Sequence, residues 1–207
     1  MSDISFNGYQ KGAIISNKRI DLSDHTLLKY NACVKMFELF PPTANSTLAD
    51  VGCNEGLIGT KILQTYKHVP VNVSFLNVKN EHSLHAVYER CRMLEVESHA
   101  LCVEGDVMTM TDAKYDYVLA FAIVHHLVKQ QQQSGGGGDM LEHVLAHLRS
   151  MTRCACVIEF PLEVFRDYDS VKRACETQFV IMGHQYISYS DFPDRNRVAF
   201  ILKPKEI

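Results

Sequence analysis

The sequence contains no tryptophan, no long apolar run and no large excess of charge of either sign. Its longest apolar run, residues 118–124, is far shorter than the roughly 20 residues that cross a bilayer, so we expect no membrane span. A net charge of −3 over 207 residues argues against a surface that coats nucleic acid. The first residues also lack the apolar stretch of a signal peptide.

Paired cysteine spacings are missing as well. The seven cysteines, an odd number, have neither the spacing of a disulfide framework nor that of a zinc site. They are typical of reduced thiols, so we expect an intracellular, reducing location such as the cytoplasm. Cys154 and Cys156 share one side of an expected strand, which indicates packing. His143 and His147 share one face of an expected helix but have no obvious third ligand, and we expect no metal.

What the chain does contain is an alternation of short apolar runs and helical patterns. The alternation predicts βαβ units in an α/β fold: a doubly wound, mostly parallel seven-stranded sheet with helices on both faces. The last two strands have no helix between them, which predicts a C-terminal antiparallel hairpin. We expect strands at 47–51, 71–78, 99–105, 115–124, 154–160, 179–190 and 197–204, helices at 22–40, 57–67, 81–96 and 140–151, and a mixed to helical stretch at 162–178.

The stretch LADVGCNEGLIG, residues 48–59, joins an expected strand to an expected helix through an acid and several glycines. Gly52 and Gly56 have no Cβ, so the backbone can turn sharply and a ligand can approach closely. The spacing is not that of a dinucleotide fingerprint, because Asn54 stands where the second glycine belongs, and no Lys-Ser or Lys-Thr follows as in a P-loop. A turn at this position of a doubly wound sheet is where ligands bind.

This turn, DVGCNEG at 50–56, resembles the first motif of the class I S-adenosylmethionine (SAM)-dependent methyltransferases. The resemblance covers about residues 47–204 and includes the order of elements and the terminal hairpin. It implies that residues of the turn line the methionine and ribose portion of the cofactor SAM, namely Asp50, Gly52, Cys53, Asn54 and Gly56.

The resemblance assigns further residues to the cofactor. Asn77 stands where the family has an acid that binds the ribose hydroxyls, and Glu81, one helical turn on, is a possible substitute. An amide can still donate and accept, but without the strength of a charge-assisted hydrogen bond. Asp106 and Val107 match the positions over the adenine, where a carboxylate accepts from the exocyclic amine and an apolar side chain covers the ring.

The fourth expected strand and its HHL ending also match the family. Asp116 fits the acid at the strand's start, which is expected to be structural. Ala120 and Phe121 are expected to face the cofactor, and His125 and His126 to lie at the mouth of the pocket.

Methyl transfer from a sulfonium is an in-line displacement, so the protein supplies alignment, desolvation and sometimes a base. A neutral histidine can take a proton from an amine or hydroxyl acceptor near pH 7. His125 and His126 are therefore the catalytic candidates, with Glu159 as a second choice. Methyltransferases that act on small-RNA 3′ ends place two glutamates and a histidine in an E-x-x-E-H segment, but here only the final His126 matches, which again implies no metal.

The same motifs also indicate a class of acceptor. The GCNEG turn, the HHL ending and VIEFP resemble methyltransferases that modify RNA 5′ ends, which slightly favours RNA. RNA contacts are expected from Lys11, Lys18 and Arg19, with Arg166, Lys172 and Arg173 as further candidates. A small-molecule acceptor is an alternative, given the acidic charge. Another is a catalytically inactive, methyltransferase-like subunit that binds or activates a protein partner, because Asn77 departs from the family's pattern.

The sequence therefore predicts two regions. Residues 1–45 form an N-terminal arm and a helix that caps the site, and residues 46–207 form the SAM-dependent methyltransferase domain. Within that domain KQQQQSGGGGD, residues 129–139, is typical of a flexible loop. Its run of one serine and four glycines also resembles an engineered splice.

Overall fold

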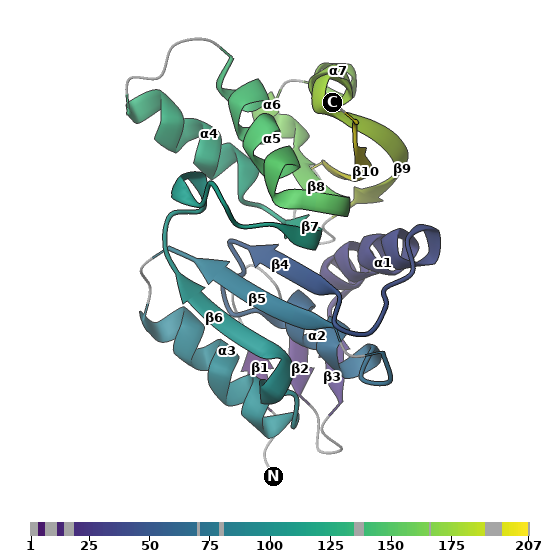
Figure 1. The fold of residues 1–207 in the computed structure, drawn as a ribbon, viewed down its shortest axis with the longest axis vertical. Helices are drawn as coiled ribbons and strands as arrows, with labels where there is room; N and C mark the ends of the chain where they lie inside the picture. Colours follow the sequence, from purple (N-terminus) through teal and green to yellow (C-terminus); the bar gives the residue numbers. More distant parts are fainter. Residues whose placement is uncertain are drawn as a thin grey trace.

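The computed structural model describes residues 4–6, 12–14, 19–69, 71–78, 81–134, 139–165, 167–188 and 196–206. Figure 1 shows a central sheet with helices on both sides. The seven strands of this sheet are β4 (Thr47–Val51), β5 (Asn72–Asn77), β6 (Ala100–Glu104), β7 (Tyr115–Ala120), β8 (Thr152–Pro161), β9 (Phe179–Ile187) and β10 (Arg197–Pro204). The helices are α1 (Asp24–Leu39), α2 (Leu57–Thr65), α3 (Glu81–Met93), α4 (Val124–Gln133), α5 (Met140–Met151), α6 (Leu162–Phe165) and α7 (Tyr168–Gln178), with 3-10 turns η1 (Glu97–His99) and η2 (Val107–Thr109).

The strand order is β6-β5-β4-β7-β8-β10-β9. Strands β4 to β8 pair in parallel, and β10 lies antiparallel between β8 and β9. The predicted doubly wound sheet and its C-terminal antiparallel hairpin are thus confirmed. Strand β4 pairs with β5 on one side and with β7 on the other, which makes its carboxyl end the point where the strand order reverses. Ligands bind at such a switch point in open α/β sheets.

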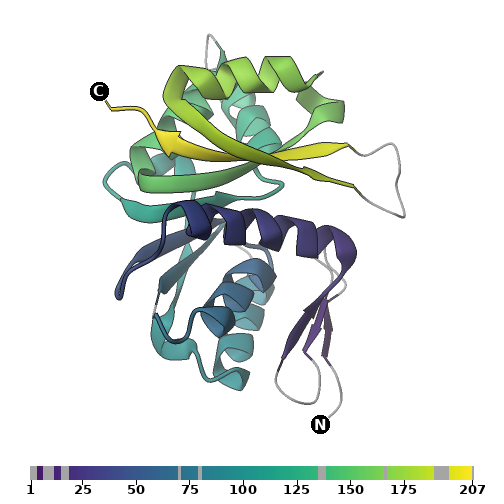
Figure 2. The same ribbon diagram turned by 90° about the vertical axis from the view of Figure 1, so that its right-hand side faces the viewer.

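Two hydrophobic cores lie on opposite faces of the sheet. Helices α1, α2 and α3 contribute to one core, and α4, α5 and α7 to the other. In Figure 2, α1 crosses the front of the view between the hairpin of β9 and β10 above and α2 below. Strands β4, β7 and β8 are buried over most of their length because both of their faces are covered.

Helix α1 runs antiparallel to the neighbouring strands. The hydroxyl of Tyr117, near the start of β7, donates to the carbonyl oxygen of Phe40 just past the end of α1 (3.0 Å). Lys29, near the start of the helix, pairs with Glu159 near the end of β8. The first turns of α1 therefore reach the carboxyl edge of the sheet.

Two expectations for the segment after β7 were wrong. The strand expected to extend to Val124 ends at Ala120, and helix α4 begins at Val124. Of the segment expected as a flexible loop, residues 129–139, the part as far as Gln133 is helical, and residues 135–138 lie outside the described residues. Val124 and Leu127 are buried at helical spacing, and glutamine is a good helix former, so the polar tract continues a helix that tertiary packing has started.

The N-terminal arm contains strands that the sequence did not indicate. These are β1 (Ile4–Phe6), β2 (Gly12–Ile14) and β3 (Ile20–Leu22), which form a three-stranded antiparallel sheet. Buried Ile20 packs on Leu57 at the start of α2, and the ammonium of Lys61 donates to the Ile20 carbonyl oxygen (2.9 Å). Across the described parts of the chain, no helix is long and apolar enough to cross a membrane.

Candidate functional site

The turn after β4 is built on backbone with positive φ. Gly52, Asn54 and Gly56 have φ of 65°, 50° and 66°. The amides of Gly52 and Cys53 both donate to the carbonyl oxygen of Leu76 in β5 (2.8 and 3.2 Å), which ties the turn to its neighbouring strand. A Cβ on Gly52 would lie 2.7 Å from Cδ1 of Ile123, so the bare face of this glycine meets the segment that leads into α4.

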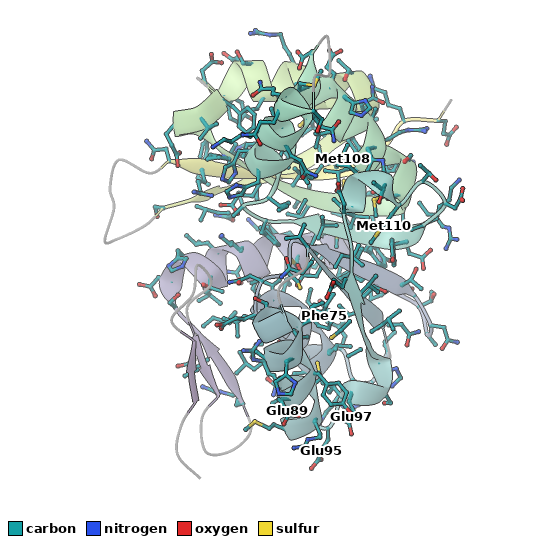
Figure 3. All side chains as sticks on the ribbon, turned by 90° about the vertical axis from the view of Figure 1, so that its left-hand side faces the viewer. Phe75, Glu89, Glu95, Glu97, Met108 and Met110 are labelled. Atoms are coloured by element: carbon teal, nitrogen blue, oxygen red, sulfur yellow. The ribbon has the colours of Figure 1, made fainter. Side chains whose placement is uncertain are left out.

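The other glycines of the motif have a different neighbour. A Cβ on Gly56 would lie 2.9 Å, and one on Gly59 2.5 Å, from the ring of Phe75 in β5. Figure 3 shows Phe75 in the interior of the molecule. These two glycines allow α2 to pack closely on β5. Of the three glycines in the motif, only Gly52 borders a space for a ligand.

Asp50 and Cys53 shape the turn from beneath. Asp50 is 1% exposed, and its Oδ2 accepts a hydrogen bond from the amide of Gly59 (3.2 Å). Burial raises the pKa of this carboxyl to about 7. Cys53 is fully buried in the core below the turn, and burial raises the pKa of its thiol far above the ordinary value. We infer that both residues support the turn and that neither lines the ligand space.

A cavity of about 30 Å³ lies at the switch point, between the ends of β4, β5 and β6 and the start of α4. It brings together four residues that the sequence analysis assigned to a cofactor: Gly52, Asn77, Asp106 and Val107. Its other lining residues are Val51, Leu76, Val78, Gly105, Ile123 and Leu127.

Ala120 and Phe121, which were expected to face the cofactor, lie elsewhere. Ala120 is buried in the core under α4 and α5, and Phe121 in the core under α1. Ile123 and Leu127 line the switch-point cavity instead, and neither was predicted from the sequence. The apolar run to Val124 reads as an extended strand, whereas the chain turns at Ala122, which has a φ of 55°. The spacing of Ile123 and Leu127, one helical turn apart, was the available signal.

Asp106 and Val107 are held in place by the neighbouring helices. The carboxylate of Asp106 caps η2 by accepting from the amide of Met108 (2.9 Å), and its other oxygen accepts from Nε2 of Gln130 in α4 (2.7 Å). The Val107 carbonyl oxygen accepts from Nε2 of His147 in α5 (2.7 Å). Figure 3 shows Met108 and Met110 on this segment after β6. His147 therefore supports the cavity wall.

His125 and His126 lie side by side at the start of α4, with ring centroids 4.0 Å apart. His125 is half-buried and His126 is exposed. Burial, and then the neighbouring His126, lower the pKa of His125 to about 4, so its imidazole is neutral at pH 7. Its Nδ1 is buried and has no hydrogen-bond partner among the residues that the structure describes. An uncharged imidazole can accept a proton, and the lowered pKa makes that of His125 a weaker base than an ordinary imidazole.

Both histidines line a second, larger cavity of about 990 Å³. It lies between α4, α5 and α6 and has both polar and apolar walls. Besides the histidines it is lined by Val128, Lys129, Gln132, Asp139, Met140, Leu141, Val164 and Phe165. Its volume is at the upper end of the range of about 300–1,000 Å³ for small-molecule sites.

Glu159 lies in a buried ionic cluster. Its side chain is 0% exposed, with one oxygen 3.1 Å from Nζ of Lys29 and the other 3.2 Å from Arg197. Arg197 also lies 3.6 Å from Glu163, and Lys29 lies over the ring of Phe121. Burial lowers the pKa of Lys29, against the raising effect of Glu159. Because both oxygens of Glu159 face buried cations, we expect this residue to be structural and not a base.

The lining of the switch-point cavity fits the chemistry of an adenosyl group. Asp106 offers a carboxylate for an amine, Asn77 a carboxamide for hydroxyls, and Val107 and Leu127 offer apolar surface for a ring. A metal is not needed to explain these residues, and the described part of the chain contains no group of three His, Cys, Asp or Glu side chains that could hold one.

The expected basic contacts lie on separate faces. Arg19 precedes β3, which packs on α2, whereas Lys172 and Arg173 lie on α7 across the sheet. Lys172 pairs with Glu176 (3.8 Å). Lys11, Lys18 and Arg166 lie outside the described residues, and so does the side chain of Glu81.

No protein-family model and no curated protein sequence matches this chain. Solved structures do match it. Magnesium protoporphyrin IX methyltransferase (ChlM) from Synechocystis PCC 6803, with bound S-adenosylhomocysteine (SAH), aligns with a TM-score of 0.65 and 12% identity over 86% of this chain and 84% of its own. N-methyltransferase NodS from Bradyrhizobium japonicum WM9, in complex with SAH, aligns with a TM-score of 0.65 and 9% identity over 89% of each chain. TrmN from Thermus thermophilus aligns with a TM-score of 0.61 and 12% identity over 87% of this chain and 49% of its own. The chain therefore has the fold of these methyltransferases.

Proposed function

We propose that this protein is a SAM-dependent methyltransferase that moves a methyl group to an oxygen or nitrogen acceptor. One observation carries the proposal. A bare glycine turn, Asn77, and the adjacent pair of Asp106 and Val107 come from three separate segments of the sequence and line one cavity at the switch point of this fold. Two of the solved structures with the same fold have SAH bound.

Each of these residues has a distinct role in holding the cofactor. Asp106 accepts from the exocyclic amine of the adenine, Val107 covers the ring, and Asn77 exchanges hydrogen bonds with the ribose hydroxyls. Gly52 lets the methionine portion approach the backbone of the turn. The bound cofactor supplies a methyl group activated on a sulfonium, and the chain's own task is to align and desolvate the acceptor.

His125 is the proposed general base. It is neutral at pH 7, and it lines the large cavity between α4, α5 and α6. It can therefore accept the proton that an amine or hydroxyl acceptor releases. His126, exposed on the same wall, is the neighbouring candidate.

RNA is the first acceptor class that we propose, with Lys11, Lys18 and Arg19 as phosphate contacts. Such contacts position a substrate without specifying it. A small molecule is the second candidate, and the cavity of about 990 Å³ beside His125 favours it. We further propose a cytoplasmic location, which the free cysteines support. If the chain proves inactive, we propose instead that it binds or activates a protein partner.

The test is transfer of labelled methyl from SAM to a panel of capped RNAs, uncapped RNAs and small amines and phenols. We expect transfer to one class, and we expect His125→Ala to lower kcat at least 100-fold, as loss of a general base does. His143→Ala, on the more distant helix α5, is the matched control and should keep activity. No transfer to any class, with SAH binding intact, would support the partner-binding alternative.

A further inference from the structure

Gln130 occupies the side of Asp106 that the proposed function assigns to adenine. Its Nε2 donates to Oδ2 of Asp106 at 2.7 Å. A primary amide and the exocyclic amine of adenine present the same group, an NH₂ donor, to a carboxylate. The donor comes from the second turn of α4, so this hydrogen bond fastens the helix across the adenine position.

The start of α4 fills the rest of the cofactor space. Ile123 lies so close to Gly52 that a Cβ on that glycine would be 2.7 Å from Cδ1. Leu127 lies against the same cavity from the next turn. The remaining volume, about 30 Å³, is far below the roughly 300 Å³ or more that small-molecule and cofactor sites have.

The connection into α4 contains a strained residue. Ala122 has a φ of 55°, a region that costs a residue with a Cβ about 1 kcal/mol or more. It separates the end of β7 from Ile123. A conformation that is held against such a cost at the entrance of a helix is a natural hinge, because rotation there moves Ile123, Leu127 and Gln130 together.

We propose that α4 is a latch, by which we mean a helix that closes the cofactor site and is held closed by the hydrogen bond from Gln130 to Asp106. The proposal rests on the proposed function, since it assumes that Asp106 binds the adenine amine. SAM enters only when Gln130 releases Asp106 and α4 swings outward about Ala122. The apparent affinity for the cofactor is then the intrinsic affinity multiplied by the fraction of molecules with the latch open.

Gln130→Ala tests the latch, and Gln133→Ala is the matched control, because Gln133 is exposed at the end of the same helix. Stopped-flow association and dissociation of SAH would be measured for the wild type and both variants. A hydrogen bond to a carboxylate is worth about a factor of ten or more, so Gln130→Ala should raise the association rate constant and the affinity about tenfold. The dissociation rate constant should stay unchanged, and Gln133→Ala should match the wild type.

Amide hydrogen exchange of residues 124–133 without added ligand gives a readout that does not depend on SAH. Gln130→Ala should exchange faster there than the wild type and Gln133→Ala. If SAH binds but Gln130→Ala leaves the association rate unchanged, or raises the dissociation rate instead, the latch is overturned and Gln130 is at most a cofactor ligand. If no variant binds SAH, the proposed function fails, while faster exchange in Gln130→Ala still shows that Gln130 fastens α4; unchanged exchange overturns the latch.

Discussion

Asp50 shows how burial changes the role of a motif residue. The sequence places an acid beside the glycine turn, and the resemblance to methyltransferases assigns it to the cofactor. In the structure its carboxyl group is buried and accepts a hydrogen bond from Gly59 across the turn. A sequence motif reveals which residue types are present, but the side of the strand that each one faces depends on the packing of α2, which no local pattern encodes.

Asp50→Asn should change how stability depends on pH. Burial raises the folded-state pKa from 3.8 to about 7, so the stability linked to the protonated carboxyl is complete below pH 4 and is lost as pH rises to about 7. Asparagine does not titrate and can still accept from Gly59. The free energy of unfolding of the wild type should therefore fall relative to the variant between pH 4 and 7, by at most about 4 kcal/mol. Denaturant titrations across that range measure it.

Asp112→Asn is the control for this experiment, because Asp112 is exposed. Its stability curve should run parallel to that of the wild type. Parallel curves for Asp50→Asn as well would mean that the Asp50 carboxyl is not perturbed.

The ionic cluster around Glu159 makes a second prediction about single residues. Glu159→Gln leaves Lys29 and Arg197 buried without the carboxylate between them, and breaking a buried pair costs about 3–5 kcal/mol. Lys29→Met leaves the pair of Glu159 and Arg197 intact and should cost less. Urea unfolding of both variants compares the two. A Glu159→Gln variant of normal stability that had lost only methyl transfer would return Glu159 to the role of base.

At the scale of elements, most of the secondary structure could be predicted. Helix 140–151 and strand 197–204 were predicted with their observed bounds, and strand 47–51 as well. The failures cluster where tertiary contacts override local pattern. Residues 121–124 are apolar enough for a strand, yet the chain turns at Ala122, and the three short strands of the N-terminal arm are stable only because they pair with one another and Ile20 packs on α2.

The strained entrance to α4 can be measured. Ala122→Gly removes the Cβ that makes a φ of 55° unfavourable, so it should raise the free energy of unfolding by about 0.5–1 kcal/mol. The same substitution inside α3, Ala86→Gly, should lower it by about 1 kcal/mol, because glycine is a poor helix former. Thermal and denaturant unfolding would compare the two. Equal losses in both variants would show that Ala122 carries no strain.

For the whole molecule, the alternation of elements predicted the fold class, and the structure adds the strand order that creates the switch point. The sequence also marked Gly52, Asn77, Asp106 and Val107, and the fold brings them to one cavity. It could not reveal that α4 covers this cavity, because Gln130 lies in a tract of glutamines that carries no periodic signal. The part of the site that the sequence did not predict is formed by contacts between separate segments, such as that between Gln130 and Asp106.

The central claim is that SAM binds at this cavity, and calorimetric titration with SAH tests it most directly. Asp106→Asn keeps the cap of η2 but removes the charge that accepts the adenine amine, and Asp112→Asn makes the same change on an exposed neighbour. Because Gln130 donates to the same carboxylate, both substitutions are made in the Gln130→Ala background, and we predict that Asp112→Asn leaves SAH affinity unchanged there whereas Asp106→Asn lowers it at least tenfold. Equal affinity in all three proteins of that background, or no binding by the wild type, would contradict the account.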